Sequence, residues 1–450
     1  PHPDGRLIMV LPLLDEKRTP LDALAGQVSS HAIIDEVISA INREFEPSLL
    51  RSSDEADHEK IKGRIHTLVG KAYHQRSLYP SSEDHTRMAD KIARRVLGLG
   101  FLDLLLPPAR TDLSEITIYS SGLVQVMPKG DVRWETIDLP VEVGEVWRII
   151  SLLLGGQLKA LNEATPSVNA RLPATRSNPG GGRIKVLHPI IAPGMGYPSV
   201  NIRLWEQKPV HPDWLLERGL MTSEMMGFLG AAVQRGWRLL ITGGTRTGKT
   251  TLLSALCNYL PQGWRIVKIE DPAEIWIDRE TVQTIEARPV PPGSEVPAYT
   301  LADGVDDAMR MAPDYLIVGE VRDGRAALAM FRALLTGHSG ACTFHANSPR
   351  EAFRRLATIM GADEGVRPHE AAQVMADSLD LLVQIGLRQE VRRVTEIVQV
   401  SRVAQGQKVD FRLLWRYDDA SSADAPHWIC LQGDNLARGD LARSQEGGRR

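Results

Sequence analysis

The chain has 450 residues, of which 43% are hydrophobic and 24% are charged, and its net charge is −3 at pH 7. These fractions are typical of a soluble globular protein, and the length exceeds what one core supports, so we expect two or three domains. The 53 basic and 56 acidic residues argue against a broad basic surface for nucleic acid, although a local basic patch stays open. The scattered cysteines, Cys257, Cys342 and Cys430, favour a reducing compartment and exclude a four-thiolate zinc site.

Residues 1–83 are expected to form a helical extension. Apolar residues recur at helical spacing between Ile34 and Phe45, and a highly charged second helix is expected between Ser53 and Tyr73. This pattern favours a solvated helix pair that packs on a neighbouring domain over a dedicated binding module.

Residues 84–215 are expected to form an α+β domain and a linker. Short alternating apolar runs predict strands, and one amphipathic stretch predicts a helix. The expected elements are strands at Glu115–Tyr119 and Val124–Met127, a helix at Val143–Leu154, and three short strands that contain Arg171, Arg183 and Arg203.

Residues 216–417 are expected to form an α/β domain in which strands alternate with helices. The expected strands that a helix follows are Leu239–Thr242, Ile266–Ile269, Tyr315–Val318 and Cys342–His345, and the closing strands are Leu381–Ile385, Glu396–Val400 and Phe411–Trp415. Such alternation predicts a mostly parallel sheet that helices cover on both faces. Residues 418–450 are polar and are expected to be disordered.

The strongest motif lies between Arg238 and Leu256, where an apolar strand, a G-x-x-x-x-G-K-T loop and a helix follow one another. The backbone amides of such a loop and the helix N-terminus together bind a polyphosphate. Lys249 is expected to reach the β- and γ-phosphates, and the Thr250 hydroxyl to bind Mg²⁺. The residues expected to bind the nucleotide here are Gly243, Gly244, Thr245, Arg246, Thr247, Gly248, Lys249, Thr250 and Thr251.

Acidic residues end two other apolar strands. Glu320 follows the strand at Tyr315–Val318, which we expect beside the loop strand, and it is the candidate for holding Mg²⁺ or orienting the attacking water. Glu270, Asp271 and Glu274 follow the strand at Ile266–Ile269. Crowded carboxylates favour a cation nearby, so Glu270 and Asp271 are expected near Mg²⁺ and Glu274 is expected to act as general base. Spacing alone does not decide which acid does which job.

One histidine and three arginines are weaker candidates. His345 closes a short strand, where it could hydrogen-bond the γ-phosphate, although a histidine at a strand end is more often structural. Guanidinium groups from outside a phosphate-loop domain often neutralise charge in the transition state. Arg171, Arg183 and Arg203 are candidates for that role, although each taken alone is more often a surface arginine.

The order of these motifs resembles the secretion and pilus traffic ATPases of type II and type IV secretion, type IV pili and conjugation. The motifs are the loop, Ile-Glu-Asp-Pro-Ala-Glu, Val-Gly-Glu-Val-Arg-Asp, and Thr-Gly-His followed by Phe-His-Ala-Asn-Ser-Pro. Gly98 to Leu105 resembles the tight-adherence pilus branch, and the stretches around Arg171 and Arg203 resemble that branch and the conjugative type IV branch alike.

The resemblance implies a RecA-like ATPase domain preceded by a PAS-like α+β domain, a homo-hexamer, and ATP with Mg²⁺ between the domains. It makes Lys249 and Thr250 the Walker A pair, Glu320 the Walker B acid and Glu274 the catalytic acid, and it adds the site residues His345, Arg203 and Arg183. It implies a motor at the cytoplasmic face of the inner membrane that acts on a membrane platform protein, with no zinc. Direct binding to nucleic acid is not expected.

Two departures leave other functions open. Arg246 lies where a small residue is commoner, and Ala312 lies where many relatives have arginine. One alternative is a nucleotide-gated scaffold with poor turnover. Another is a RecA-like nucleic-acid translocase, which needs a basic channel lined with aromatic residues that the sequence does not offer.

Overall fold

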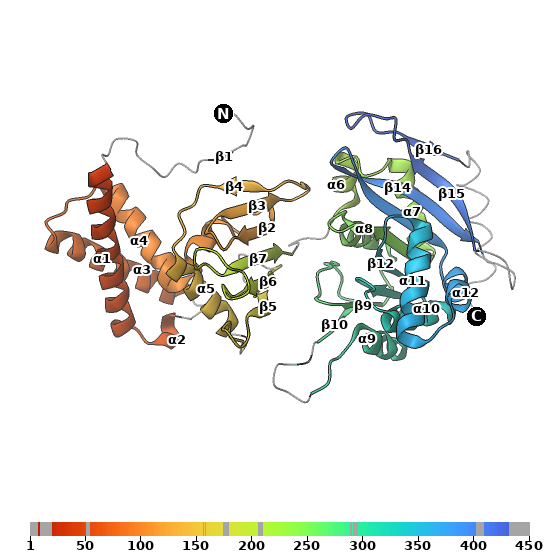
Figure 1. The fold of residues 1–450 in the computed structure, drawn as a ribbon, viewed down its shortest axis with the longest axis horizontal. Helices are drawn as coiled ribbons and strands as arrows, with labels where there is room; N and C mark the ends of the chain where they lie inside the picture. The colour runs from red at the N-terminus through yellow and green to blue at the C-terminus, as the bar shows by residue number, and fades with distance from the viewer. Residues whose placement is uncertain are drawn as a thin grey trace. The chain divides into compact units, whose positions relative to one another are not determined.

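The structure is a computed structural model. It describes residues 8–9, 20–50, 55–155, 157, 159–173, 180–205, 210–288, 290, 296–401 and 409–431. The chain divides into two compact units, Pro1–Trp205 and Glu206–Arg450, and each is described by itself (Figure 1). Among the described helices, none combines the length and the apolar character that a membrane span requires.

The first unit begins with a helical layer that has its own apolar core. Its helices are α1 (Pro20–Glu44), α2 (Pro47–Leu50), α3 (Glu55–Gln75) and α4 (Ser82–Leu97). Ile34, Ile61 and Ile92 belong to one buried cluster that joins α1, α3 and α4. The expected helices between residues 34 and 73 are therefore confirmed, and α1 starts earlier than its apolar spacing indicated. Although α4 packs in this layer, the boundary that we place at residue 84 stays a prediction.

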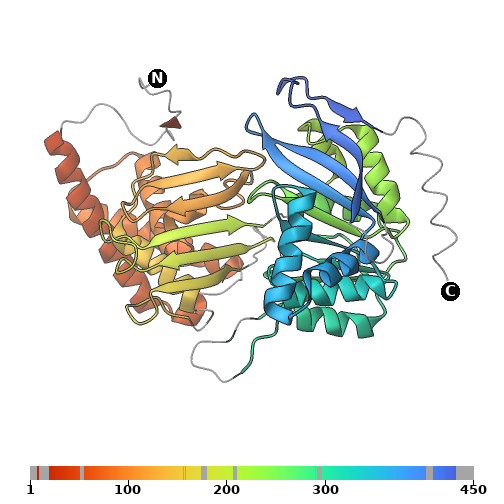
Figure 2. The same ribbon diagram turned by 45° about the vertical axis from the view of Figure 1, so that its right-hand side comes forward.

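The rest of the first unit is an antiparallel sheet with a helix on one face. The strands are β1 (Ile8–Met9), β2 (Leu113–Ile118), β3 (Val124–Pro128), β4 (Glu135–Ile137), β5 (Ser167–Leu172), β6 (Gly182–Leu187) and β7 (Ser199–Leu204). Their order is β1-β4-β3-β2-β7-β6-β5, and only the β1–β4 pair is parallel among the described strands. Figure 2 shows the orange and yellow strands of this sheet side by side. Every strand predicted in this part of the chain is confirmed.

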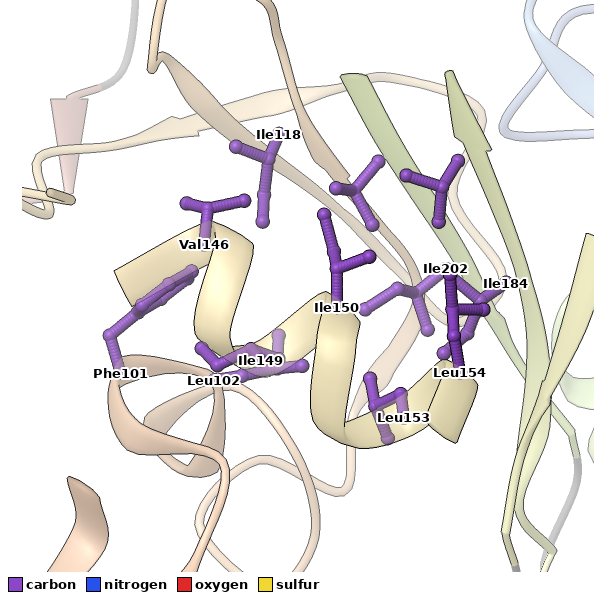
Figure 3. Close-up of a pocket in the computed structure, with 12 residues that line it drawn as sticks. Phe101, Leu102, Ile118, Val146, Ile149, Ile150, Leu153, Leu154, Ile184 and Ile202 are labelled. Carbon is purple, nitrogen blue, oxygen red and sulfur yellow. The ribbon is translucent and has the colours of Figure 1, made fainter. Parts of the chain in front are cut away.

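Helix α5 (Val143–Gly155) packs on this sheet through apolar side chains. Figure 3 shows Ile150 and Leu154 pointing from α5 toward Ile118, Ile184 and Ile202 of the sheet. Because successive residues of a strand point to opposite faces, the residues that alternate with these in β5, β6 and β7 face away from α5.

The second unit contains a nine-stranded sheet with the order β10-β9-β11-β12-β8-β13-β14-β15-β16. The strands are β8 (Leu239–Gly243), β9 (Ile266–Glu270), β10 (Val282–Glu286), β11 (Tyr315–Val318), β12 (Ser339–His345), β13 (Leu381–Arg388), β14 (Val391–Ser401), β15 (Asp410–Tyr417) and β16 (Trp428–Cys430). From β10 to β13 all neighbours are parallel, and from β13 to β16 they are antiparallel. This is the mostly parallel α/β sheet that the alternation of strands and helices predicted.

Helices cover both faces of this sheet. They are α6 (Pro212–Glu217), α7 (Ser223–Gln234) and α8 (Lys249–Leu256) on one face, and α9 (Leu301–Ala308), α10 (Gly324–Leu335), α11 (Pro349–Glu364) and α12 (Pro368–Ser378) on the other. In β8, Leu239 and Ile241 face the first group, whereas Leu240 faces the second. A strand that is buried on both faces reads as a continuous apolar run, which is why its pattern was easy to recognise.

Two expectations for the second unit are wrong. A helix does not follow β9 directly, because the edge strand β10 intervenes and α9 starts only at Leu301. The predicted disorder does not hold for residues 418–431, where β16 pairs with β15 and the ring of Trp428 packs edge-on against Tyr417. The remainder of that predicted tail, residues 432–450, lies outside the described residues.

Helix α5 offers a test of the core of the first unit. Leu154 is 1% exposed and Leu152, on the same helix, is 42% exposed. We expect Leu154→Ala to lower the free energy of unfolding by about 3 kcal/mol, because it removes buried methyl groups and leaves a cavity. Leu152→Ala is the control and should change it by less than about 0.5 kcal/mol. Urea denaturation followed by circular dichroism measures both, and equal losses would contradict this packing.

Candidate active site

The phosphate loop joins β8 to α8 and has unusual backbone angles. Gly248 caps α8 with a φ of 97°, and Arg246 has a φ of 61°. Positive φ is uncommon for a residue with a Cβ atom, so the conformation of Arg246 needs support from its surroundings. Gly243 is needed for a different reason, since a Cβ atom there would lie 2.6 Å from the carbonyl oxygen of Ile385.

Lys249 places a buried positive charge against this loop. The residue is 7% exposed, and its Nζ donates to the carbonyl oxygens of Gly243 at 3.1 Å and Gly244 at 2.9 Å. The Thr247 hydroxyl donates to the same Gly244 oxygen at 2.9 Å and closes the loop. An ammonium group next to a helix N-terminus and a tight loop is the arrangement that captures a phosphate. Thr250 and Thr251 continue the first turn of α8.

Strand β12, and not β11, lies beside the loop strand. His345 of β12 is level with Gly243 of β8, and Val318 of β11 is level with Cys342 of β12. The expectation that β11 is the neighbour of β8 is therefore wrong. The carboxyl ends of these parallel strands still meet at one edge of the sheet. His345 Nε2 lies 3.4 Å from the hydroxyl oxygen of Thr245, so the structure brings the predicted histidine to the loop.

Two of the four predicted acids are held together by one guanidinium group. Arg322 donates from Nε to Glu320 at 2.8 Å and from Nη1 to Asp271 at 3.2 Å. A positive charge between two carboxylates offsets their mutual repulsion, which lets these two acids lie side by side. Arg322 is one of the arginines that remain to supply a contact in place of the one missing at Ala312, but its pairing with Glu320 and Asp271 was not predicted.

Glu270 differs from the other acids because both of its carboxylate oxygens already have partners. Its side chain is 2% exposed, and Oε2 accepts a hydrogen bond from Lys268 at 2.7 Å. Oε1 accepts the backbone N–H groups of Glu274 at 3.0 Å and Ile275 at 2.9 Å. Burial raises the pKa of Glu270, while Lys268 and the two amides oppose that shift. This arrangement does not favour the predicted magnesium role. Glu270 instead holds the backbone of residues 274 and 275, in the turn that follows β9.

The remaining oxygen donors suit a magnesium ion that also binds substrate. Among the described residues, no group of three or more His, Cys, Asp and Glu side chains is arranged to hold a metal ion. Mg²⁺ is commonly held by one or two carboxylates together with phosphates and water, so a dedicated cage is not required. Thr250, Asp271 and Glu320 fit such a site as predicted ligands, and the roles of Glu274 and Glu320 in catalysis stay predictions.

The predicted arginines of the first unit form a row across three strands. Arg171 of β5 is level with Arg183 of β6, and Arg183 is level with Arg203 of β7. All three lie on the face of the sheet opposite α5, because the residues beside them in sequence belong to the core on the other face. Like charges that face one another across strands are unfavourable, and Glu115 of β2, which is level with Arg203, adds an acidic residue at the end of this row. Sequence spacing alone could not reveal the alignment.

One contact to the phosphate loop was not predicted. Arg392, in the hairpin of β13 and β14, donates from Nε to the carbonyl oxygen of Arg246 at 2.9 Å. This bond supports the residue whose φ is positive, and it joins positions that are 146 residues apart in sequence. A local motif contains no signal for such a contact.

Comparison with known proteins places these features in a family. The family model described as "Type II/IV secretion system protein" matches residues 158–411. The conjugal transfer protein TrbB of Rhizobium radiobacter is 30% identical over 243 residues, which are 53% of this chain and 69% of that protein. The type IV secretion system protein VirB11 of Bartonella henselae is 25% identical over 333 residues, with 65% of this chain and 91% of that protein covered.

Solved structures give a weaker likeness. The ATPase DotB of Legionella pneumophila is 17% identical, with a TM-score of 0.45, and the match covers 74% of this chain and 82% of that one. The family assignment rests on the sequence match instead, which spans more than half of the residues and includes the phosphate loop, both acidic strand ends and His345. The chain belongs to the type II/IV secretion system protein family.

Proposed function

We propose that this chain is an ATP-hydrolysing motor that works as a hexamer at the cytoplasmic face of the inner membrane. It drives pilus assembly, secretion or conjugative transfer by acting on a membrane platform protein. The observation that carries the proposal is the phosphate loop with its buried Lys249. Glu320 and His345 lie at the carboxyl ends of β11 and β12, on the same side of the sheet as the loop. The conjugal transfer and type IV secretion names of the relatives support the traffic role.

The chemistry follows from where charge develops during hydrolysis. Lys249 and the loop amides neutralise the β- and γ-phosphates, and Thr250 and Glu320 would hold Mg²⁺, which would supply further positive charge there. Glu274 accepts a proton from the attacking water, and His345 contacts the γ-phosphate from β12. We also assign Arg203 and Arg183 to the neutralisation of phosphate charge, and their alignment with Arg171 on one face of the sheet supports this assignment.

Lys249→Ala tests the loop. We expect this variant to lower kcat for Mg²⁺-dependent ATP hydrolysis at least about 100-fold, because one preorganised cationic donor to the transition state is lost. Glu274→Gln should also lose turnover but keep nucleotide binding. Release of inorganic phosphate and binding of a fluorescent ATP analogue measure the two effects. Wild-type turnover by Lys249→Ala would refute the proposal, and DNA-stimulated hydrolysis with salt-dependent DNA binding would favour a translocase.

Arg203→Ala tests the charge row. The expected result is a loss of at least about tenfold in kcat/KM, because a guanidinium group that stabilises transferring phosphate is removed. Lys185→Ala is the matched control, since Lys185 is on β6 of the same sheet and two residues from Arg183. If both variants hydrolyse ATP like the wild type, the row does not serve the phosphates.

Arg392→Gln tests the support of the phosphate loop. Loss of a charge-assisted hydrogen bond to the Arg246 carbonyl should raise KM for ATP about tenfold, since such a bond contributes about 1.5 kcal/mol or more. Arg388→Gln is the control, because Arg388 of the same hairpin pairs with Asp419 instead. An unchanged KM in Arg392→Gln would show that the loop keeps its conformation without this contact.

A further inference from the structure

A buried ion pair lies in β9. The residues that follow β9, 271–275, contain Asp271 and Glu274 and are called the acidic turn below. Lys268 and Glu270 are two residues apart on the strand, so their side chains share one face of the sheet. Their side chains are 8% and 2% exposed, and Lys268 Nζ lies 2.7 Å from Glu270 Oε2. Ile266, on the same face, belongs to the apolar cluster that α8 covers. Two charges therefore lie inside an otherwise apolar layer.

The pair makes three further hydrogen bonds to backbone atoms of the turn. Lys268 Nζ donates to the carbonyl oxygen of Ile275 at 2.6 Å. Glu270 Oε1 accepts from the N–H of Glu274 at 3.0 Å and from the N–H of Ile275 at 2.9 Å. Residues 274 and 275 are thus tied back to the end of β9, so the conformation of the turn depends on both members of the pair.

Glu270 also contacts the end of the neighbouring strand. A Cβ atom on Gly319 would lie only 2.9 Å from Cγ of Glu270, so the side chain of Glu270 packs closely against the backbone of Gly319. Gly319 immediately precedes Glu320, and its N–H donates to the carbonyl oxygen of Ile269 at 2.9 Å. One buried side chain therefore contacts the backbone at both acidic strand ends.

A role in stability alone explains this arrangement poorly. Desolvating two charges costs several kcal/mol per ion, and apolar residues of the same volume are often at least as stabilising. Hydrogen bonds to a buried, fully partnered carboxylate do, however, fix geometry more narrowly than apolar contacts do. The pair is better explained by what it orients than by the free energy that it contributes.

We propose that Lys268 and Glu270 are positioning residues that set Glu274 relative to Glu320 for water activation. The inference rests on the proposed ATP hydrolysis and gives neither residue a contact with nucleotide or metal. Disturbing the pair should therefore reduce the rate of the chemical step while the phosphate loop still binds nucleotide. Replacing both charged residues with apolar ones should restore the stability that a single replacement loses, but it should not restore the geometry of the turn.

The experiment uses the full chain with Glu270→Gln and the double variant Lys268→Met/Glu270→Met. We expect both to lower kcat at least about tenfold, while KM and the dissociation constant of a fluorescent ATP analogue stay within about twofold, because losing an orienting contact slows chemistry without removing binding contacts. The thermal midpoint of the double variant should be close to that of the wild type.

The control is an ion pair at the amino ends of the strands of the same sheet, whereas the acidic turn follows the carboxyl end of β9. Arg238 lies just before β8, and Asp380 lies just before β13. Arg238 donates from Nη2 to Asp380 Oδ1 at 2.8 Å and from Nε to Asp380 Oδ2 at 3.0 Å. Asp380→Asn should lower the thermal midpoint and leave kcat unchanged. If kcat falls in this variant as far as in Glu270→Gln, or if Glu270→Gln keeps wild-type kcat, the positioning role is overturned. Recovery of kcat in the double variant would overturn it as well.

Hydrogen exchange separates this inference from the proposed function. The amides of Glu274 and Ile275 should exchange at least about tenfold faster in Glu270→Gln without nucleotide, because both lose a charged acceptor. Exchange at Leu239 in β8 serves as the internal control. If the wild type fails to hydrolyse ATP, the proposed function fails, and faster exchange confined to the turn still supports the grip on the backbone. Unchanged exchange at these two amides overturns the inference in either case.

Discussion

A polyphosphate carries several negative charges, and a protein binds it only where positive groups are held in place before it arrives. In this chain that requirement is met where β8 ends. The loop after β8 turns its backbone around Gly243 and Gly248, and Lys249 is buried against it. The parallel sheet brings further strand ends to the same edge, which is how His345 and the acids come to lie near a motif that is distant in sequence.

The supports of this edge come from parts of the chain that form no part of the phosphate-loop motif. Arg392 reaches the loop from the β13–β14 hairpin, and Arg322 joins Glu320 to Asp271. The buried pair of Lys268 and Glu270 holds the turn that carries Glu274. Each support is a charge-assisted hydrogen bond, and the bond between Lys268 and Glu270 is also buried, where exclusion of water strengthens it. The site therefore depends on charged groups of two kinds. Some would contact the phosphates, and the others hold those contacting groups in position.

Much of this fold could be predicted from the sequence, because strands such as β8 and β11 are buried on both faces and read as uninterrupted apolar runs. The elements that were missed have weaker patterns. In β10 only Val282 and Ile285 are apolar and the strand lies at an edge, so its pattern resembles a loop. The strand β16 is only three residues long and owes its place to the packing of Trp428, which a polar stretch of sequence hides.

The candidate site was predictable where chemistry is local and not where it depends on pairing between distant residues. The phosphate loop is one continuous motif, whereas the order of β8, β12 and β11 is set by which strands pair. The alignment of Arg171 with Arg183 and Arg203 likewise depends on strand register. Lys268 could have been noticed, since a lysine inside the apolar run Ile-Val-Lys-Ile needs a buried partner and Glu270 lies two residues away.

The proposed function requires that the loop after β8 bind the polyphosphate of ATP with magnesium. The most direct measurement is an experimental structure of the full chain with a non-hydrolysable ATP analogue and Mg²⁺. We expect Lys249 Nζ to leave the carbonyl oxygens of Gly243 and Gly244 and to contact the γ-phosphate, with Mg²⁺ at the Thr250 hydroxyl. A nucleotide bound elsewhere, or a Lys249 that stays on those carbonyl oxygens while the analogue is bound, would contradict it.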